Sequence, residues 1–110
     1  MKNYKKLQPL RISSNWSIEF NKFLNINPKK ILKKNKLWKY YFTEDILLLK
    51  NQNKNLLIDL GWYPSSNPKG KFILLVIKNN NWEKPILKFS SRNKNKIVKK
   101  IEKLISKNLN

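Results

Sequence analysis

The sequence predicts an α+β fold, in which an antiparallel sheet of four or five strands packs one face against a C-terminal amphipathic helix. Short apolar runs separated by polar turns predict the strands, and one apolar stripe of helical spacing predicts the helix. The 110 residues suffice for one domain, since two halves would each be too small to hold a core. We expect a partly ordered basic leader at residues 1–14 and a single α+β domain at residues 15–110.

The first predicted strand covers residues 16–20, because apolar and polar side chains alternate there with the period of two that is typical of a half-buried strand. Residues 27–36 are polar and basic, and they predict a loop or a short helical turn. The apolar run 46–49 predicts the next strand. In the alternative, Thr43 caps a short helix and the two acidic residues after it lie in its first turn.

A hairpin is predicted around residues 51–55, a polar turn between two apolar runs. In the second run, alternate residues share one face of a strand: Leu56, Ile58, Leu60 and Trp62. Pro64 ends this strand, and residues 65–70 carry the breakers of a turn. Residues 72–77 are apolar on both faces, as in a central strand. The last strand is predicted at residues 85–89, where a proline at the start costs little.

The C-terminal helix is predicted from apolar residues spaced by one, three and four positions: Ile97, Val98, Ile101, Leu104 and Ile105. Asn93 or Ser91 is its candidate N-cap. Lysines occupy the rest of its surface. We interpret them as a solvated face, and the alternative is a surface that grips phosphates.

The formal net charge of +19 is large enough to attract nucleic acid, an anionic membrane or an acidic protein. However, only Arg11 and Arg92 among the 25 basic residues are arginine, the side chain on which specific readers of bases rely. Asn is abundant and Ala is absent, a bias that an A/T-rich coding sequence produces on any surface. We interpret most of the lysine excess as this bias and expect nucleic-acid binding, if present, to be non-specific.

The residue types argue against an enzyme. Without His or Cys, the chain lacks the commonest general base, the thiolate nucleophile and the usual zinc ligands. Of the six carboxylates, the adjacent Glu44 and Asp45 would point to opposite faces of a strand. Glu19 and Asp59 could meet across neighbouring strands as a catalytic pair, but we interpret each carboxylate as solvated or paired with lysine. We therefore predict no catalytic residues, no metal and no cofactor. No apolar run is long enough for a membrane span and the N-terminus does not lead into a signal core, so we expect a cytoplasmic protein without a membrane partner.

The most distinctive segment contains Asp59 inside an otherwise apolar strand. Gly61 there permits another backbone to approach closely. In a structural interpretation, Trp62 lies in the core and Tyr63 covers Gly61. In a functional one, Asp59 and Tyr63 belong to an exposed recognition surface, for which Tyr and Trp are favoured anchors. The aromatic residues Trp38, Tyr40 and Tyr41 have the same two interpretations, core packing or a docking platform.

Several strings in the chain resemble those of one protein family. They are Trp16 with Glu19-Phe20-Asn21-Lys22-Phe23, Asn27-Pro28, Phe42-Thr43-Glu44-Asp45, Ile58-Asp59-Leu60-Gly61-Trp62-Tyr63-Pro64, Asn67-Pro68-Lys69-Gly70 and Asn81-Trp82-Glu83-Lys84-Pro85. Together with the closing amphipathic helix, they resemble small bacterial immunity proteins of polymorphic toxin systems of the contact-dependent growth inhibition type. The resemblance spans about Trp16 to Ile105. It implies a cytoplasmic protein that binds a cognate toxin domain and blocks its active site or substrate groove.

The resemblance and the residue pattern together predict a partner-binding surface of aromatic and acidic side chains: Asp59, Tyr63, Glu19, Trp38, Tyr40, Glu44 and Asp45. The C-terminal helix would seal the other face of the sheet, and the protein would be a monomer or a small homo-oligomer. The strongly basic charge departs from the family and argues against a conventional basic nuclease as the toxin. The alternative function is a basic nucleic-acid-binding module, in which lysines grip phosphates and aromatic side chains stack on bases.

Overall fold

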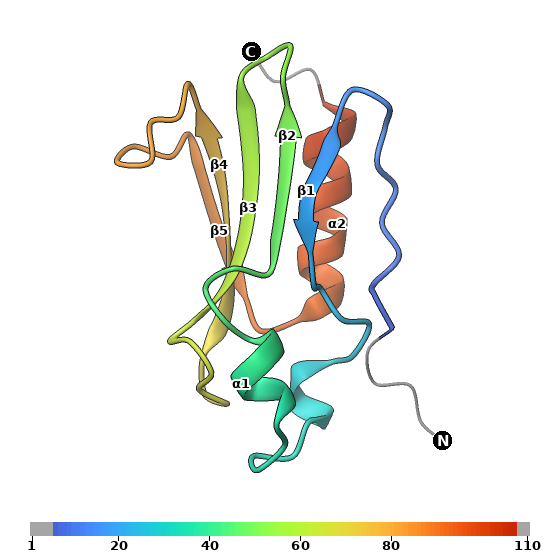
Figure 1. Cartoon of the computed structure of the whole chain (residues 1–110), viewed down its shortest axis with the longest axis vertical. Helices are drawn as coiled ribbons and strands as arrows, with labels where there is room; N and C mark the ends of the chain where they lie inside the picture. The colour runs from blue at the N-terminus through green and yellow to red at the C-terminus, as the bar shows by residue number, and fades with distance from the viewer. Residues whose placement is uncertain (1–5, 108–110) are drawn as a thin grey trace.

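The computed structural model describes residues 6–107 and confirms the predicted α+β class (Figure 1). Five antiparallel strands form one sheet in their order along the chain: β1 (Ser17–Asn21), β2 (Leu47–Asn51), β3 (Leu56–Tyr63), β4 (Lys71–Lys78) and β5 (Leu87–Ser91). The 3-10 helix η1 (Pro28–Lys30) and the helix α1 (Leu37–Tyr41) connect β1 to β2. The helix α2 (Lys94–Ser106) follows β5 and lies behind the sheet in Figure 1.

The core lies between the sheet and α2. Alternate residues of β2, β3 and β4 are buried on the helix side: Leu47, Leu49, Leu56, Ile58, Leu60, Trp62, Phe72, Leu74 and Val76. The predicted stripe of α2 packs against them, with Ile97, Ile101, Leu104 and Ile105 buried. Each such side chain contributes about 1.5–3 kcal/mol by leaving water. Asn93 caps α2, because its side chain accepts hydrogen bonds from the N–H groups of Asn95 and Lys96.

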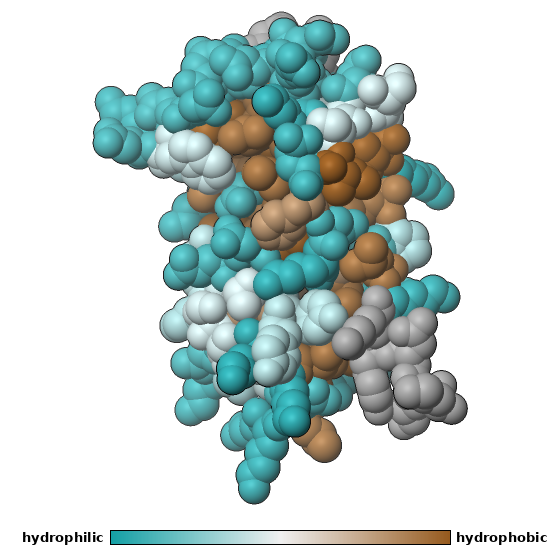
Figure 2. Space-filling model, in the orientation of Figure 1, coloured by the Kyte–Doolittle hydropathy of each residue, from teal (hydrophilic) through white to brown (hydrophobic). Residues whose placement is uncertain are grey.

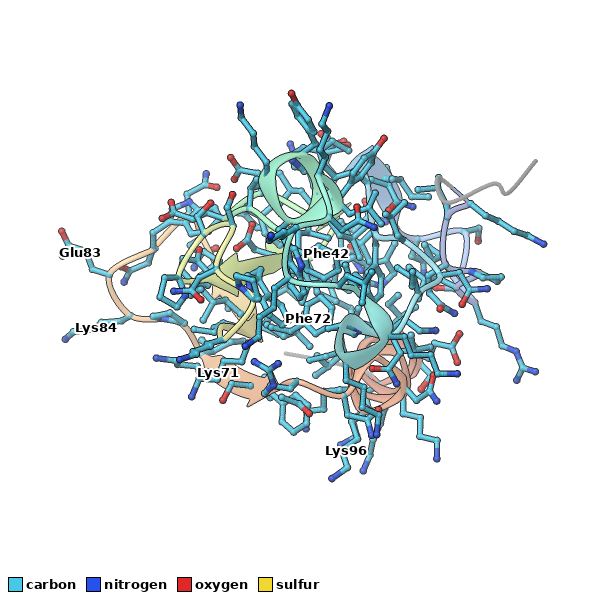
Figure 3. All side chains as sticks on the ribbon, turned by 90° about the horizontal axis from the view of Figure 1, so that it is seen from below. Phe42, Lys71, Phe72, Glu83, Lys84 and Lys96 are labelled. Carbon is cyan, nitrogen blue, oxygen red and sulfur yellow. The ribbon has the colours of Figure 1, made fainter. Side chains whose placement is uncertain are left out.

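Aromatic rings close the end of the core beside α1. Trp62 meets Phe42 and Phe72 edge-on, with ring centroids 5.1 and 4.9 Å apart. Phe42 and Phe72 lie in the interior when the molecule is seen from below (Figure 3). Edge-to-face pairs of this kind add about 0.5–1.5 kcal/mol beyond their buried area. The segment between β1 and β2 is therefore attached to the sheet through its aromatic side chains.

Residues 6–12 of the predicted leader run beside α2 and the end of β1. Leu7 forms an isolated bridge with Leu24, and the Gln8 N–H donates to the carbonyl of Phe23 at 2.8 Å. The buried Lys94 side chain donates to the side-chain oxygens of Gln8 and Asn25. The first five residues of that leader lie outside the described residues. Between residues 6 and 107, no helix combines the length and the apolar character that crossing a membrane requires.

The strand at residues 17–21 exists, but its predicted half-buried face is wrong. Ile18 lies opposite Leu49 and Phe20 lies opposite Leu48, so the register shifts between them. Such a bulge turns the next side chain to the other face of the sheet. Phe20 is therefore turned away from the core and is 38% exposed. Ile18, although it lies opposite the buried Leu49, is 51% exposed on this edge strand, and only Trp16 of the three is buried, at 8%.

The starts of two other strands test the sequence prediction, one of which is confirmed and one corrected. Thr43 lies in a bend and not at a helix N-terminus, which confirms the strand interpretation of the run that comes after it. The last strand begins at Leu87, two residues after its predicted start at Pro85. The Ile86 N–H donates to the Val76 carbonyl at 2.9 Å, so pairing with β4 begins at Ile86 and not at Pro85. The remaining strands and the turns between them lie where the sequence predicts them.

Candidate functional site

The sheet face opposite α2 is covered by no helix among the described residues. Its middle row crosses all five strands, as the pairing register shows: Phe20, Leu48, Asp59, Leu75 and Lys88. We call this surface the open face and include Leu57, Tyr63 and Ile73, which lie on the same side of β3 and β4. It points towards the viewer in Figures 1 and 2, and Figure 2 shows apolar side chains gathered over the sheet between polar ones. A half-buried apolar surface of this kind is typical of a docking site.

Asp59 lies at the centre of the open face. Its neighbours across the strands are Leu48 and Leu75, and Leu57 precedes it on the same side of β3. Within residues 6–107, its carboxylate has neither a hydrogen bond nor an ion pair, and its oxygens still reach solvent. Partial burial among leucines and, as a smaller cause, the negative charge of Asp45 raise the pKa of Asp59 from 3.8 to about 6.

Gly61 brings the segment with Glu44 and Asp45 against β3. The Ile46 N–H donates to the Leu60 carbonyl at 2.9 Å, and the Trp62 N–H donates to the Thr43 carbonyl at 2.8 Å. Between these two bonds, the two acidic residues loop out opposite Gly61. A Cβ on Gly61 would overlap the Glu44 carbonyl and would lie 2.8 Å from Cε1 of Tyr63. Only glycine permits this approach, because every other residue carries that Cβ.

Tyr63 completes the cluster and covers Gly61, as the structural interpretation of the sequence expects. Burial raises the pKa of the Tyr63 hydroxyl, and the charges of Asp59, Glu44 and Asp45 raise it further. We call these four residues the acidic spot. The chain has a net charge of +19 and six carboxylates, and three of the six raise the pKa of this one tyrosine. A cation placed at this spot would meet three negative charges beside the leucines of the open face.

The other predicted site residues lie elsewhere. Glu19 is exposed on the edge strand β1 and accepts a hydrogen bond from the Ser17 hydroxyl at 3.0 Å. Tyr40 is 57% exposed on α1, where the Lys39 ammonium lies 5.5 Å from its ring centroid. Neither residue is among the groups whose charges act on Asp59 or Tyr63.

Trp38 belongs to the core and not to a surface, so the expectation that it contacts a partner is corrected. It is 4% exposed, packs on Phe42 and Trp62, and donates from Nε1 to the Leu32 carbonyl at 3.0 Å. The short helix α1 turns Leu37 and Trp38 inwards and Lys39 and Tyr40 outwards. Core packing, the other interpretation of this aromatic run, holds for Trp38.

Sequence reasoning missed the apolar part of the site, which is formed by Phe20, Leu48, Leu57, Ile73 and Leu75. The alternation along residues 56–63 was a usable signal for the sides of β3, but it does not identify cross-strand neighbours. Within residues 6–107, no three His, Cys, Asp or Glu side chains are arranged to hold a metal ion, and this includes the acidic spot.

Comparison of the chain with protein-family models, with curated proteins and with solved structures gave no match.

Proposed function

We propose that this chain is an immunity protein, which binds a cognate toxin domain through the open face and occludes its active site or substrate groove. The observation that carries the proposal is Asp59, a carboxylate without a partner among leucines on a sheet face that no described helix covers. An unpaired, partly buried carboxylate lowers the stability of the folded protein by itself. A partner that places a cation beside Asp59 stabilises the carboxylate, and this stabilisation contributes to the free energy of binding.

The layout of the open face favours a protein partner over a small ligand. The acidic spot is flanked by half-buried leucines across three strands, which can exclude water once a surface docks on them. Charged pairs at the centre of such an interface become stronger when water is excluded around them, and they also make binding specific for the partner. We therefore expect the toxin to present one or two basic side chains within an apolar patch, so that they reach Asp59 and Tyr63.

The toxin assignment is supported by where the resembling strings lie. Residues 42–45 and 58–64 carry much of the resemblance to immunity proteins, and these two segments build the acidic spot around Gly61. Immunity proteins act on toxins in the cytoplasm, and the same location is expected for this chain under the proposal. Inhibition by occlusion requires no catalytic group, which agrees with the lack of His and Cys.

The test first looks for a toxin domain encoded beside the gene for this chain and then measures whether the chain protects growing cells against that domain. Cells that express this domain are co-transformed with the wild-type chain, with Asp59→Lys, or with Leu75→Lys, which places a charge beside Asp59. The matched control is Lys103→Glu, which also alters one exposed charge but lies on α2. We expect the wild type and the control to protect and to bind the toxin, and both open-face variants to fail while keeping their circular dichroism spectra.

Two outcomes would contradict the proposal in different ways. A wild-type chain that neither binds nor protects would refute the immunity function. Protection by both folded open-face variants would keep the function but place the interface elsewhere.

A further inference from the structure

A second surface lies on the far side of the sheet, between α2 and β5. Four lysines and one aromatic side chain line a shallow groove of about 210 Å³: Lys96, Lys99, Lys100, Lys103 and Phe89. We call it the lysine groove. It shares no residue with the open face, so a ligand bound in this groove is independent of the proposed immunity function.

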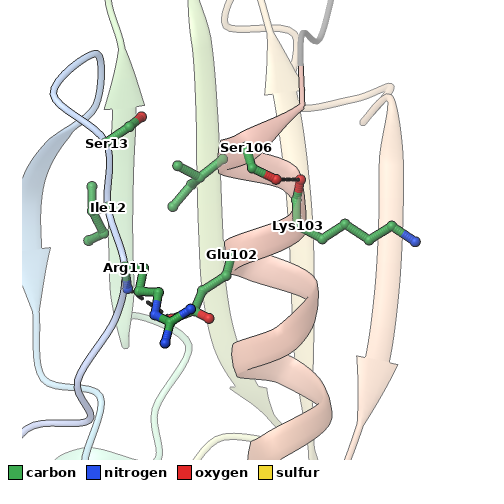
Figure 4. Close-up of a pocket in the computed structure, with 7 residues that line it drawn as sticks. Arg11, Ile12, Ser13, Glu102, Lys103 and Ser106 are labelled. Carbon is green, nitrogen blue, oxygen red and sulfur yellow. Dashed lines mark hydrogen bonds between the residues drawn. The ribbon is translucent and has the colours of Figure 1, made fainter.

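No carboxylate of the described residues lines the lysine groove to offset its charge. The only acidic residue of α2 is Glu102, and its side chain accepts a hydrogen bond from the Arg11 N–H at 2.8 Å on the other side of the helix. Figure 4 shows Glu102 turned towards residues 11–13 and the Lys103 side chain extending away from them. Within residues 6–107, one ammonium group of the lysine groove has a contact: that of Lys100, which lies 5.5 Å from the centroid of the Phe89 ring. These cations are therefore available to a ligand.

Lys96 lies about one helical turn, or about 5.4 Å, before Lys99 and Lys100, and Lys103 lies about one turn after them. From Lys96 to Lys103 the row extends over seven residues, or about 10 Å. A row of ammonium groups along a groove fits a ligand that repeats its negative charge along a line. A nucleic-acid strand does so through its phosphates, for which Lys acts as a point charge, and Phe89 offers an apolar contact to a sugar or base.

The packing of α2 disfavours the other anionic partners. A membrane-surface helix inserts its apolar face into the lipid, but Ile97 and Ile101 of α2 are buried against the sheet. In an extended acidic peptide only alternate side chains face one surface, and carboxylates leave Phe89 without the sugar or base that a nucleotide supplies beside each phosphate. We propose that the lysine groove binds the phosphate backbone of a single nucleic-acid strand without reading its bases.

The expected salt dependence is set by the number of contacts. Four lysines that each neutralise one phosphate of a single strand give a slope of log K against log salt of about −0.7 × 4, or about −2.8. A fourfold rise in salt concentration then weakens this contribution by about 50-fold. The rest of the +19 charge adds a diffuse attraction, which a matched control must separate from the groove.

The experiment compares two variants that each lose four positive charges. The groove variant is Lys96→Gln, Lys99→Gln, Lys100→Gln and Lys103→Gln together. The control variant is Lys29→Gln, Lys30→Gln, Lys33→Gln and Lys34→Gln, four exposed lysines in the segment between β1 and β2. Fluorescence anisotropy with a labelled single-stranded DNA of about 20 nucleotides measures the affinity between about 50 and 200 mM salt.

We expect the groove variant to lose most of the affinity, and its slope of log K against log salt to become shallower by about 2.8. Both changes should be far smaller in the control variant. Equal losses in the two variants would show a diffuse field and overturn the proposal, as would a wild-type chain that does not bind at about 50 mM salt. Equal or tighter binding to polyglutamate, or to vesicles that contain anionic lipid, would reassign the groove to an acidic protein or a membrane. Circular dichroism of both variants confirms that the fold is kept.

Discussion

Replacing Asp59 by asparagine removes the ionisable group from the open face and keeps the shape of the side chain. In the folded protein, the pKa of Asp59 is about 6, whereas the reference value for the unfolded chain is 3.8. Folding therefore favours the protonated carboxyl. The contribution of Asp59 to stability is fully present below pH 3.8, decreases as the pH rises towards 6, and is lost above that.

The magnitude is given by the size of the shift. About two pKa units correspond to at most about 3 kcal/mol at 1.36 kcal/mol per unit. Because the carboxylate oxygens reach solvent, screening reduces this to about 1–2 kcal/mol. We expect Asp59→Asn to raise the free energy of unfolding by this amount at pH 7.5 and to leave it nearly unchanged at pH 4.

Urea unfolding followed by tryptophan fluorescence measures the difference at both pH values, since Trp62 is buried in the folded state. The control is Asp45→Asn, an exposed carboxylate of the same acidic spot, for which we expect a change within about 0.5 kcal/mol. An Asp59→Asn variant that is no more stable than the wild type at pH 7.5, or that gains equally at both pH values, would refute the reasoning.

Three other variants and one change of pH test the contacts in and near this site. Gly61→Ala should destabilise the protein by more than about 2 kcal/mol, because the added Cβ overlaps the Glu44 carbonyl, and a thermal melt that matches the wild type would contradict this close approach. In urea unfolding, Trp38→Ala should lower the free energy of unfolding by about 3–5 kcal/mol, because its ring is buried. Tyr40→Ala should lower it by less than about 0.5 kcal/mol, because its ring is exposed. Equal losses would mean that the inward side of α1 is misassigned. Binding of a basic partner to the open face should strengthen as the pH rises through about 6, because Asp59 must ionise to pair with it; calorimetric affinities that do not change across this range would remove Asp59 from the interface.

Much of the fold is readable from local pattern. The alternation of Leu56, Ile58, Leu60 and Trp62 identifies the inner side of β3, and the apolar stripe of α2 identifies its buried face. These patterns depend only on the geometry of one strand or one helix, so they survive whatever the rest of the chain does. The strand predicted at residues 16–20 exists, but its predicted buried face was wrong, because a bulge breaks the period of two that such a prediction assumes.

The sequence by itself predicted most strands, the turns between them, the helix α2 and the unusual position of Asp59 in an apolar strand, but not the short helix α1. Only the tertiary structure decided what surrounds that carboxylate. Leu48 and Leu75 become its neighbours through the strand register, and Glu44 and Asp45 reach it because Gly61 lets their backbone approach. Trp38 and Tyr40 were separated in the same way, by the side of α1 that meets Trp62. The physical reason is that cross-strand pairing and burial join residues far apart in the chain, which no local period encodes.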